Sequence, residues 1–526
     1  MAKTSASGSF HLFVGKMLST VILAVGTIIL TIFIGEPEYG LYTIALVPAT
    51  TLLLFEDWGV GTAMAKYCAQ YRGTNEEGDL REIIEVGLTF KIATGIVLTV
   101  ISLLTANLIA STIFDQSETA FLITLVSITI LSSSLLAGAQ SIFIGFERMK
   151  LNSFTIVCSA TLHGVLSPLL VYLGYGASGA VLGYTFSSVV AGIFAITLLY
   201  FAVFKKLPPN TSTKLNESQT MKLLLRYGVP LAIATILVGI LTQFYSFMLA
   251  SLFDPTQIGN YRTASNFATL LTFFTFPIST VLFPAFSKLD PRNEPQILKS
   301  VFSSSVKYTS LFLVPATMAL MVLSKPIIGT IYGDKWLNAP LFLAFYVIND
   351  LFAVVGNFSV YSLLQGLGET KMVMKQNALT LIVGVPLAFL LIPTFGILGV
   401  ILGPYLAGKP SLFWGLCYIW KHYKVKVDFK SSTRIFMTSA IAAITTYLSL
   451  NFLATAEWIR LVIGGIIFLG IYLFAAPMIG AFNQTDINNL KTMFSGLGIV
   501  SKLINIPFVM LEKITKTFHA SNTSSE

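Results

Sequence analysis

Residues 35–61 read GEPEYGLYTIALVPATTLLLFEDWGVG. The stretch opens with a polar turn, continues as an uncharged apolar run from Gly40 to Phe55, and closes with Glu56-Asp57-Trp58-Gly59. Its opening is echoed later, because Gly40-Leu41-Tyr42-Thr43 resembles Gly259-Asn260-Tyr261-Arg262, 219 positions on. Residues 176–183 (GASGAVLG) and 396–403 (GILGVILG) form a second echo, 220 positions apart. Two echoes at nearly one spacing predict a duplicated half.

The composition is typical of a membrane protein. Hydrophobic residues make up 55% of the 526 residues, charged residues make up 11%, and the mean hydropathy is +0.79. A soluble globular protein carries about 25% charged residues, so burying this much apolar surface requires a bilayer as solvent. The sequence therefore predicts an all-α polytopic membrane protein.

Segments of about 20 apolar residues are long enough to cross a bilayer, and we predict about fourteen of them. They are 12–34, 41–66, 84–113, 119–145, 152–174, 177–204, 224–251, 259–286, 301–323, 337–366, 373–393, 397–420, 433–453 and 458–481. Six spans return a chain to the side from which it entered. The first twelve therefore predict two parallel six-helix repeats around a central cavity, with two extra C-terminal helices.

These spans divide the chain into five parts. Residues 1–204 form an N-terminal six-helix half, and residues 222–421 form a C-terminal six-helix half. The polar stretch 205–221, with two prolines, predicts a cytoplasmic linker. Helices 13 and 14 occupy 422–481, and residues 482–526 predict a cytoplasmic amphipathic tail on the membrane surface.

The net charge of +9 reflects membrane topology rather than a nucleic-acid partner. Most of the 33 Lys and Arg residues fall in the two tails and in the loops on the same side, whereas Lys325, Lys335 and Arg460 lie in the opposite loops. Because positive loops stay in the cytoplasm, we expect both termini to be cytoplasmic. The excess charge would then contact anionic lipid headgroups.

No motif points to catalysis, a metal or a cofactor. The sequence contains no Walker loop, GxSxG or HExxH, and its three cysteines lie far apart. The outer loops are too short for the external domain of many membrane glycosyltransferases. We therefore expect a transporter and not an enzyme.

Carboxylates inside spans are candidate functional residues, since a charge in a bilayer costs about 3 kcal/mol. Glu56 and Asp57 lie inside the second predicted span, and Asp350 lies midway along the tenth. We interpret these three as candidates for ion coupling. The alternative is that Glu56 and Asp57 form a structural pair that closes a helix irregularity before Gly59.

Cations in or beside spans are candidates for binding an anionic substrate. A helix dipole does not favour a cation near the helix start. For the arginine that opens the eighth span we therefore expect an anionic partner, either Asp254 or a phosphate, which guanidinium binds bidentately. Three of the lysines have the alternative of snorkelling to the interface, namely Lys16, Lys91 and Lys307. The candidates are Arg262, Lys409, Lys91, Lys307 and Lys16.

Four sequence features together carry a family resemblance. They are Gly35-Glu-Pro-Glu-Tyr-Gly40-Leu-Tyr42, Asp57-Trp-Gly59-Val-Gly61-Thr-Ala63, the pair Gly145-Phe-Glu147-Arg-Met-Lys150 and Gly366-Leu-Gly-Glu369-Thr-Lys371, and the glycine repeats. With them, the chain from about residue 10 to about residue 480 resembles the polysaccharide (O-antigen, Wzx-type) flippase family. That family belongs to the multidrug/oligosaccharidyl-lipid/polysaccharide (MOP) exporter superfamily.

The resemblance implies a flippase that moves a polyprenyl-diphosphate-linked oligosaccharide from the cytoplasmic to the outer leaflet by alternating access. The five cations would receive the lipid diphosphate in the cavity. The membrane potential, or Na+ or H+ coupled through Glu56, Asp57 or Asp350, would bias the step. We expect a monomer in the cell membrane, in contact with membrane lipids and without a nucleic-acid partner.

Three alternatives remain. A lipid II flippase of the same superfamily is barely distinguishable by sequence. A cation-coupled multidrug exporter often carries a carboxylate on its first span, and residues 12–34 contain no Asp or Glu. A membrane glycosyltransferase or polymerase would need an acidic pair in a large outer loop.

Overall fold

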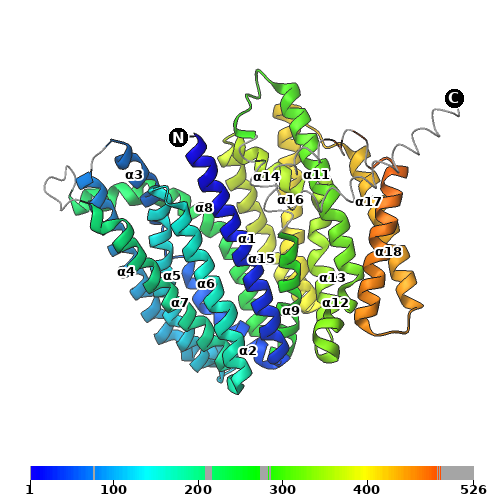
Figure 1. The fold of residues 1–526 in the computed structure, drawn as a ribbon, viewed down its shortest axis with the longest axis horizontal. Coiled ribbons are helices and arrows are strands. Elements are labelled where there is room, and N and C mark those ends of the chain that lie inside the picture. Colours follow the sequence, from blue (N-terminus) through cyan, green and yellow to red (C-terminus); the bar gives the residue numbers. More distant parts are fainter. Residues whose placement is uncertain are drawn as a thin grey trace. The chain divides into compact units, whose positions relative to one another are not determined.

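The computed structural model describes residues 2–74, 77–207, 216–272, 282, 286–481, 484, 486 and 488. Every regular element within these residues is a helix (Figure 1), and this confirms the all-α fold. The chain divides into two compact units. Unit 1 comprises Met1–Asn266 and Leu381–Pro404, and unit 2 comprises Phe267–Thr380 and Tyr405–Glu526. The division into two six-helix halves, linker and tail stays a prediction.

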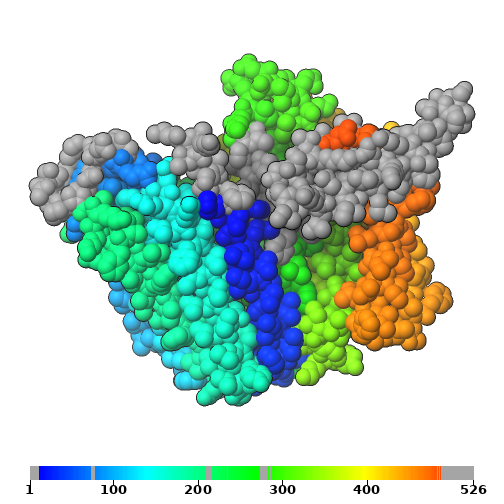
Figure 2. All heavy atoms as spheres, in the orientation of Figure 1, coloured from blue at the N-terminus to red at the C-terminus, as the bar shows by residue number. Residues whose placement is uncertain are grey.

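Unit 1 is a bundle in which α1 packs along α6, and α5 packs between α4 and α7 (Figure 1). In the space-filling view, the blue α1 lies beside the cyan-coloured part of this bundle (Figure 2). The apolar faces of α3, α4 and α5 form its core, which includes Met64, Ile84 and Phe143. The helices are α1 (Ala2–Phe33), α2 (Glu36–Leu53), α3 (Val60–Thr74), α4 (Glu77–Leu108), α5 (Thr119–Gly145), α6 (Met149–Leu170), α7 (Gly176–Ala202), α8 (Glu217–Leu252) and most of α9 (Pro255–Ala268).

Unit 2 has its own core, in which Phe302, Leu363 and Ile419 are fully buried. Its helices α17 and α18 pack against each other as a hairpin (Figure 1). The helices are α11 (Pro295–Val322), α12 (Ser324–Tyr332), α13 (Ala339–Tyr346), α14 (Asn357–Gly366), α17 (Phe429–Asn451) and α18 (Glu457–Met478). The helices α15 (Thr370–Phe395) and α16 (Ile397–Tyr423) contribute residues to both units.

The described residues contain nine helices long and apolar enough to cross a membrane, or ten if the bent pair Ala339–Val355 and Asn357–Gly366 is one span. One of the nine, Met149–Lys206, joins α6 and α7 and so covers two predicted spans. Three further predicted spans are not among these membrane-crossing helices, for different reasons. Span 41–66 is broken, span 259–286 extends outside the described residues, and span 433–453 is the Ser- and Thr-rich helix α17.

The predicted continuous helix over 41–66 is wrong, since α2 ends at Leu53 and α3 begins at Val60. Trp58 and Gly59 have φ angles of 44° and 75°, a left-handed conformation that a continuous helix does not contain. The Gly61 N–H donates to the Asp57 Oδ1 (2.9 Å) and caps the start of α3. A Cβ at Gly59 would overlap the backbone of Gly228, so close packing also requires glycine there.

The first sequence echo brings the starts of α2 and α9 into contact. A Cβ at Gly40 would overlap the backbone of Pro255, and a Cβ at Gly259 would overlap the carbonyl of Glu36. Glu36 and Pro255 are the first residues of their helices, and they are separated by the same 219 positions as the two glycines. Each contact is therefore the equivalent of the other, and this reciprocity supports the predicted duplication.

Other equivalent positions share unusual backbone conformations. The φ angles of Gly176 and Gly396 are 51° and 60°, and those of Glu147 and Gly368 are 55° and 77°. Glu147 is the one residue of the four that is not glycine, and a positive φ is uncommon outside glycine. The two pairs are 220 and 221 positions apart, close to the spacing of the first echo. They place equivalent sharp turns at the ends of corresponding helices.

The α2–α9 contact gives a stability prediction. Gly40→Ala should lower the free energy of unfolding by about 1–3 kcal/mol, because the added methyl group forces the two backbones apart. Gly465→Ala is the matched control, since a Cβ there has open space. Thermal unfolding of the purified proteins in detergent measures both. Equal melting temperatures for the two variants would contradict the tight contact.

Candidate functional site

Lys91 of α4 is 1% exposed, and its ammonium bonds two carboxylates. The Nζ–Oε1 distance to Glu56 is 2.9 Å, and the second ion pair is with Asp57. Both acids lie in the break between α2 and α3. The Ser134 hydroxyl donates to the Lys91 carbonyl (2.8 Å) and ties α4 to α5. Lys91 therefore joins two helices to the backbone break.

This geometry decides among the alternatives for these residues. The alternative that Lys91 snorkels to the membrane interface is wrong, because its side chain is enclosed by protein. The paired and partly buried acids match the interpretation of Glu56 and Asp57 as a structural pair at a helix irregularity. Substrate binding by Lys91 and ion coupling by the two acids stay predictions.

Arg262 of α9 is exposed, and its guanidinium lies within hydrogen-bonding reach of the Tyr39 hydroxyl. The Asn266 Nδ2 donates to the Tyr39 Oη (2.7 Å). The Tyr39 ring stacks on Tyr42 with centroids 5.8 Å apart. Asp254, the partner we considered for Arg262, accepts a hydrogen bond from the Gln257 N–H (3.0 Å) and caps α9. Arg262 thus stands beside aromatic side chains of α2.

Two further aromatic residues, His163 and Tyr184, lie near this cation. Like Tyr42, both are close enough to Arg262 to feel its charge. His163 of α6 packs edge-on against Tyr184 of α7, with centroids 4.9 Å apart. Sequence reasoning selected Arg262 and missed Tyr39, Tyr42 and Tyr184. The signal available was that Tyr42 belongs to the first repeated motif and that Tyr39 directly precedes it.

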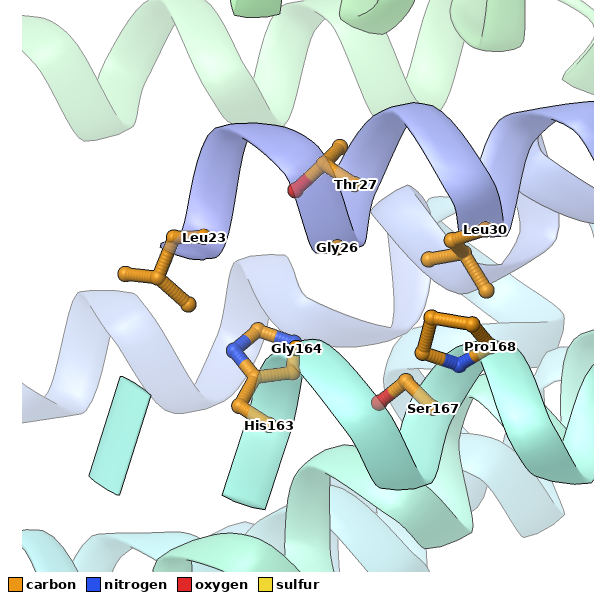
Figure 3. Close-up of a pocket in the computed structure, with 8 residues that line it drawn as sticks. All are labelled: Leu23, Gly26, Thr27, Leu30, His163, Gly164, Ser167 and Pro168. Atoms are coloured by element: carbon orange, nitrogen blue, oxygen red, sulfur yellow. The ribbon is translucent and has the colours of Figure 1, made fainter. Parts of the chain in front are cut away.

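A small void lies between α1 and α6 beside His163 (Figure 3). Its volume is about 10 Å³, which suits one water molecule. The hydroxyl groups of Thr27 and Ser167 and the His163 ring line it, and the backbones of Gly26 and Gly164 approach closely next to it. The void is too small for a lipid headgroup.

Unit 2 brings together two residues that the sequence analysis had selected separately. The Lys409 Nζ donates to the Asn349 Oδ1 (2.8 Å) and stands 3.3 Å from the centroid of the Phe352 ring. The carboxylate of Asp350 lies close enough for its charge to act on Lys409. The arrangement combines a cation–π contact with a nearby acid.

The backbone around Asp350 is irregular, although the sequence predicted one span over 337–366. The nine residues Val347–Val355 form a 3₁₀ helix, and Gly356 after it has a φ of 82°. At this glycine the segments Ala339–Val355 and Asn357–Gly366 meet at 59°. A long 3₁₀ stretch within a span often marks a hinge. Its tighter winding places Asn349, Asp350 and Phe352 near Lys409.

The remaining candidates have other surroundings. The Lys307 Nζ lies 2.6 Å from the Asp486 Oδ2. Lys16 is an exposed residue of α1. Substrate binding by both stays a prediction. Most of the predicted amphipathic tail, from residue 489 onward, lies outside the described residues.

Residues 5–290 match the family model described as "Polysaccharide biosynthesis protein". This match covers more than half of the 526 residues. The chain belongs to the polysaccharide biosynthesis protein family. Residues 230–390 also match the MatE model. The two matches confirm the resemblance to polysaccharide flippases of the MOP superfamily.

Curated relatives of this polysaccharide biosynthesis family member include two Bacillus subtilis (strain 168) proteins. Stage V sporulation protein B is 26% identical over 434 residues, which are 76% of this chain and 80% of the relative. Lipid II flippase MurJ is 22% identical over 485 residues, which are 84% of this chain and 88% of the relative. The chain is similar to them over most of its length.

A solved structure shows the same fold. It is described as lipid II flippase MurJ in an inward closed conformation, and its TM-score against this chain is 0.70 at 18% identity. The alignment covers 90% of this chain and 98% of that chain. With the apolar helices described above, it shows that the protein is a multi-pass membrane protein.

Proposed function

We propose that this protein is a flippase that moves a polyprenyl-diphosphate-linked oligosaccharide from the cytoplasmic to the outer leaflet. Membership of the polysaccharide biosynthesis protein family supports a saccharide-linked substrate. The relative named lipid II flippase supports translocation of a lipid. The two proposed six-helix halves would alternate access to a shared cavity.

The observation that carries the proposal is the exposed residue Arg262 on α9 of unit 1. A guanidinium offers paired donors that match the oxygens of a phosphate. Tyr39 and Tyr42 beside it are only 1% and 4% exposed, so they would hold the guanidinium in place rather than contact the substrate. Lys409, bonded to the neutral amide of Asn349, would provide a second positive charge for the diphosphate.

Further parts of the proposal concern energy, orientation and state. Asp350, beside Lys409 in the irregular segment of unit 2, would take up Na+ or H+, and Glu56 with Asp57 would be the second coupling position. The distribution of Lys and Arg supports cytoplasmic termini. The protein would act as a monomer in the cell membrane, without a catalytic step.

Deletion of the gene tests the proposed function directly. Cells lacking the protein should accumulate the lipid-linked saccharide in the inner leaflet, where an impermeant oxidant or lectin added outside cannot reach it. Re-expression of the full chain should restore outer-leaflet exposure. Unchanged glycans together with lost dye efflux would instead identify a multidrug exporter.

A lipid II flippase is the second candidate, because the relative with that name aligns over 84% of this chain. The same deletion distinguishes it from the first candidate. Inner-leaflet accumulation of the peptidoglycan precursor would identify a lipid II flippase. Accumulation of another saccharide lipid, with peptidoglycan synthesis unchanged, supports the first proposal.

A further inference from the structure

Unit 2 contains a cavity whose lining residues include neither Lys409 nor Asp350. Its volume is about 390 Å³, within the range of small-molecule sites. It is an open cavity lined by residues of α12, of the short 3₁₀ helix η5 (Gly333–Lys335), of α13 and by the first residue of α18. In the proposed orientation α12, residues 333–335 and Glu457 lie between predicted spans on the outer side, and α13 begins the tenth span there, so the cavity faces the outer surface.

One side of the cavity presents acceptors for a cationic hydrogen-bond donor. Glu457 is fixed in place, because its Oε1 accepts from the Arg460 Nη1 (2.8 Å) and Gly329 leaves no space beside it. Its Oε2 is buried and has no hydrogen-bond partner within the described part of the chain. Such an atom carries a desolvation cost until it meets a donor. Asp334 adds a second carboxylate to the lining.

The same cavity also offers a cation and an apolar wall. Lys325 is exposed at the start of α12 and lines the cavity, where its ammonium is available for a phosphate. Leu337 and Leu341 line it as well and are 81% and 50% exposed. Trp336 is 2% exposed and forms a rigid part of the lining. The site therefore combines carboxylates, an ammonium and exposed apolar side chains.

We propose that this cavity binds the headgroup of a membrane lipid with a primary ammonium and a phosphate, of the phosphatidylethanolamine class. The lipid ammonium would donate to Glu457 and Asp334, the phosphate would contact Lys325, and the upper acyl chain would cover Leu337 and Leu341. A purely anionic lipid would leave Glu457 without a donor. A quaternary ammonium has no N–H to donate. The bound lipid is a resident ligand and is separate from the proposed transported substrate.

Lipid retention by the purified full-length protein tests this site. Native mass spectrometry after incubation with dioleoyl-phosphatidylethanolamine, dioleoyl-phosphatidylcholine or dioleoyl-phosphatidylglycerol gives the three affinities. We expect the ethanolamine lipid to bind about tenfold more tightly than the other two, as one charge-assisted hydrogen bond predicts. Equal retention of the ethanolamine and choline lipids would overturn the proposal.

Variants locate the site. Glu457→Gln keeps an oxygen for Arg460 and should abolish the preference for the ethanolamine lipid over the choline lipid. Lys325→Gln should weaken the binding of all three lipids about tenfold. Glu118→Gln, at an exposed carboxylate between η1 (Ile109–Ile113) and α5, is the matched control and should change nothing. An unchanged preference in Glu457→Gln, or unchanged affinities in Lys325→Gln, would refute the assignment.

A soluble ligand separates the headgroup from the lipid. Glycerophosphoethanolamine should bind much more weakly than the intact lipid, because it does not cover the leucines. Equal affinity would show that the apolar wall plays no part, and the lipid assignment would then be wrong. None of these measurements depends on flipping, so their failure would leave the proposed function untouched.

Discussion

Lys91→Ala should destabilise the folded protein by about 3–5 kcal/mol, the cost of leaving a buried charge without its partner. The substitution removes the ammonium that bonds Glu56 and Asp57, and Glu56 is only 5% exposed. The break between α2 and α3 would lose its connection to α4. Denaturant unfolding of the purified protein in detergent measures the change.

Two comparisons make the Lys91 result specific. The triple variant Lys91→Met, Glu56→Gln, Asp57→Asn removes the charges together and should recover much of the lost stability. Lys150→Ala, at an exposed lysine, is the control and should stay near the wild type. A Lys91→Ala protein that is as stable as Lys150→Ala but inactive in flipping would instead support the prediction that Lys91 binds substrate.

Arg262→Ala should reduce the flipping rate about ten- to a hundredfold, because hydrogen bonds to a charged group contribute about 1.5–3 kcal/mol. Arg262→Lys should retain part of the activity, since it keeps the charge but loses the bidentate geometry. Lys409→Ala should also reduce flipping, because it removes the proposed second charge for the diphosphate. The measurement is outer-leaflet exposure of the saccharide lipid at equal membrane abundance.

Two comparisons make the Arg262 result specific, and one of them lies within its own cluster. Tyr39→Phe removes the hydroxyl beside the guanidinium and keeps the ring that stacks on Tyr42, so it should have a smaller effect than Arg262→Ala. Lys150→Ala should be neutral, because its charge is exposed. Full activity of both Arg262→Ala and Lys409→Ala would remove the proposal of a cationic cavity.

The sequence predicted the helical membrane fold well, because that fold depends on local pattern; the duplication stays a prediction, which the close approach of Gly40 to Pro255 supports. Long apolar runs mark helices, and the echoes at Gly40 and Gly259 mark positions where two backbones touch. It failed at Leu54–Gly59, where the apolar run continues past the end of α2. The break depends on the φ angles of Trp58 and Gly59 and on the contact with Gly228, and these are tertiary properties.

The candidate charges show the same limit. Residue type and position within an apolar run selected Lys91, Glu56, Asp350 and Lys409. Their pairing did not follow from the sequence, because Lys91 and Glu56 are on different elements and Lys409 meets Asn349 across 60 positions. The 3₁₀ segment that brings Asp350 near Lys409 has no helix-breaking residue within Val347–Val355.

The reciprocal glycine contact has a consequence for the history of the chain. In a two-fold symmetric homodimer, a contact between residue i of one subunit and residue j of the other is always matched by a contact between residue j of the first and residue i of the second. Here both members belong to one polypeptide. Under the predicted duplication, the contact would descend from an ancestor of half the length that associated with a second copy of itself through this surface before the two copies were fused.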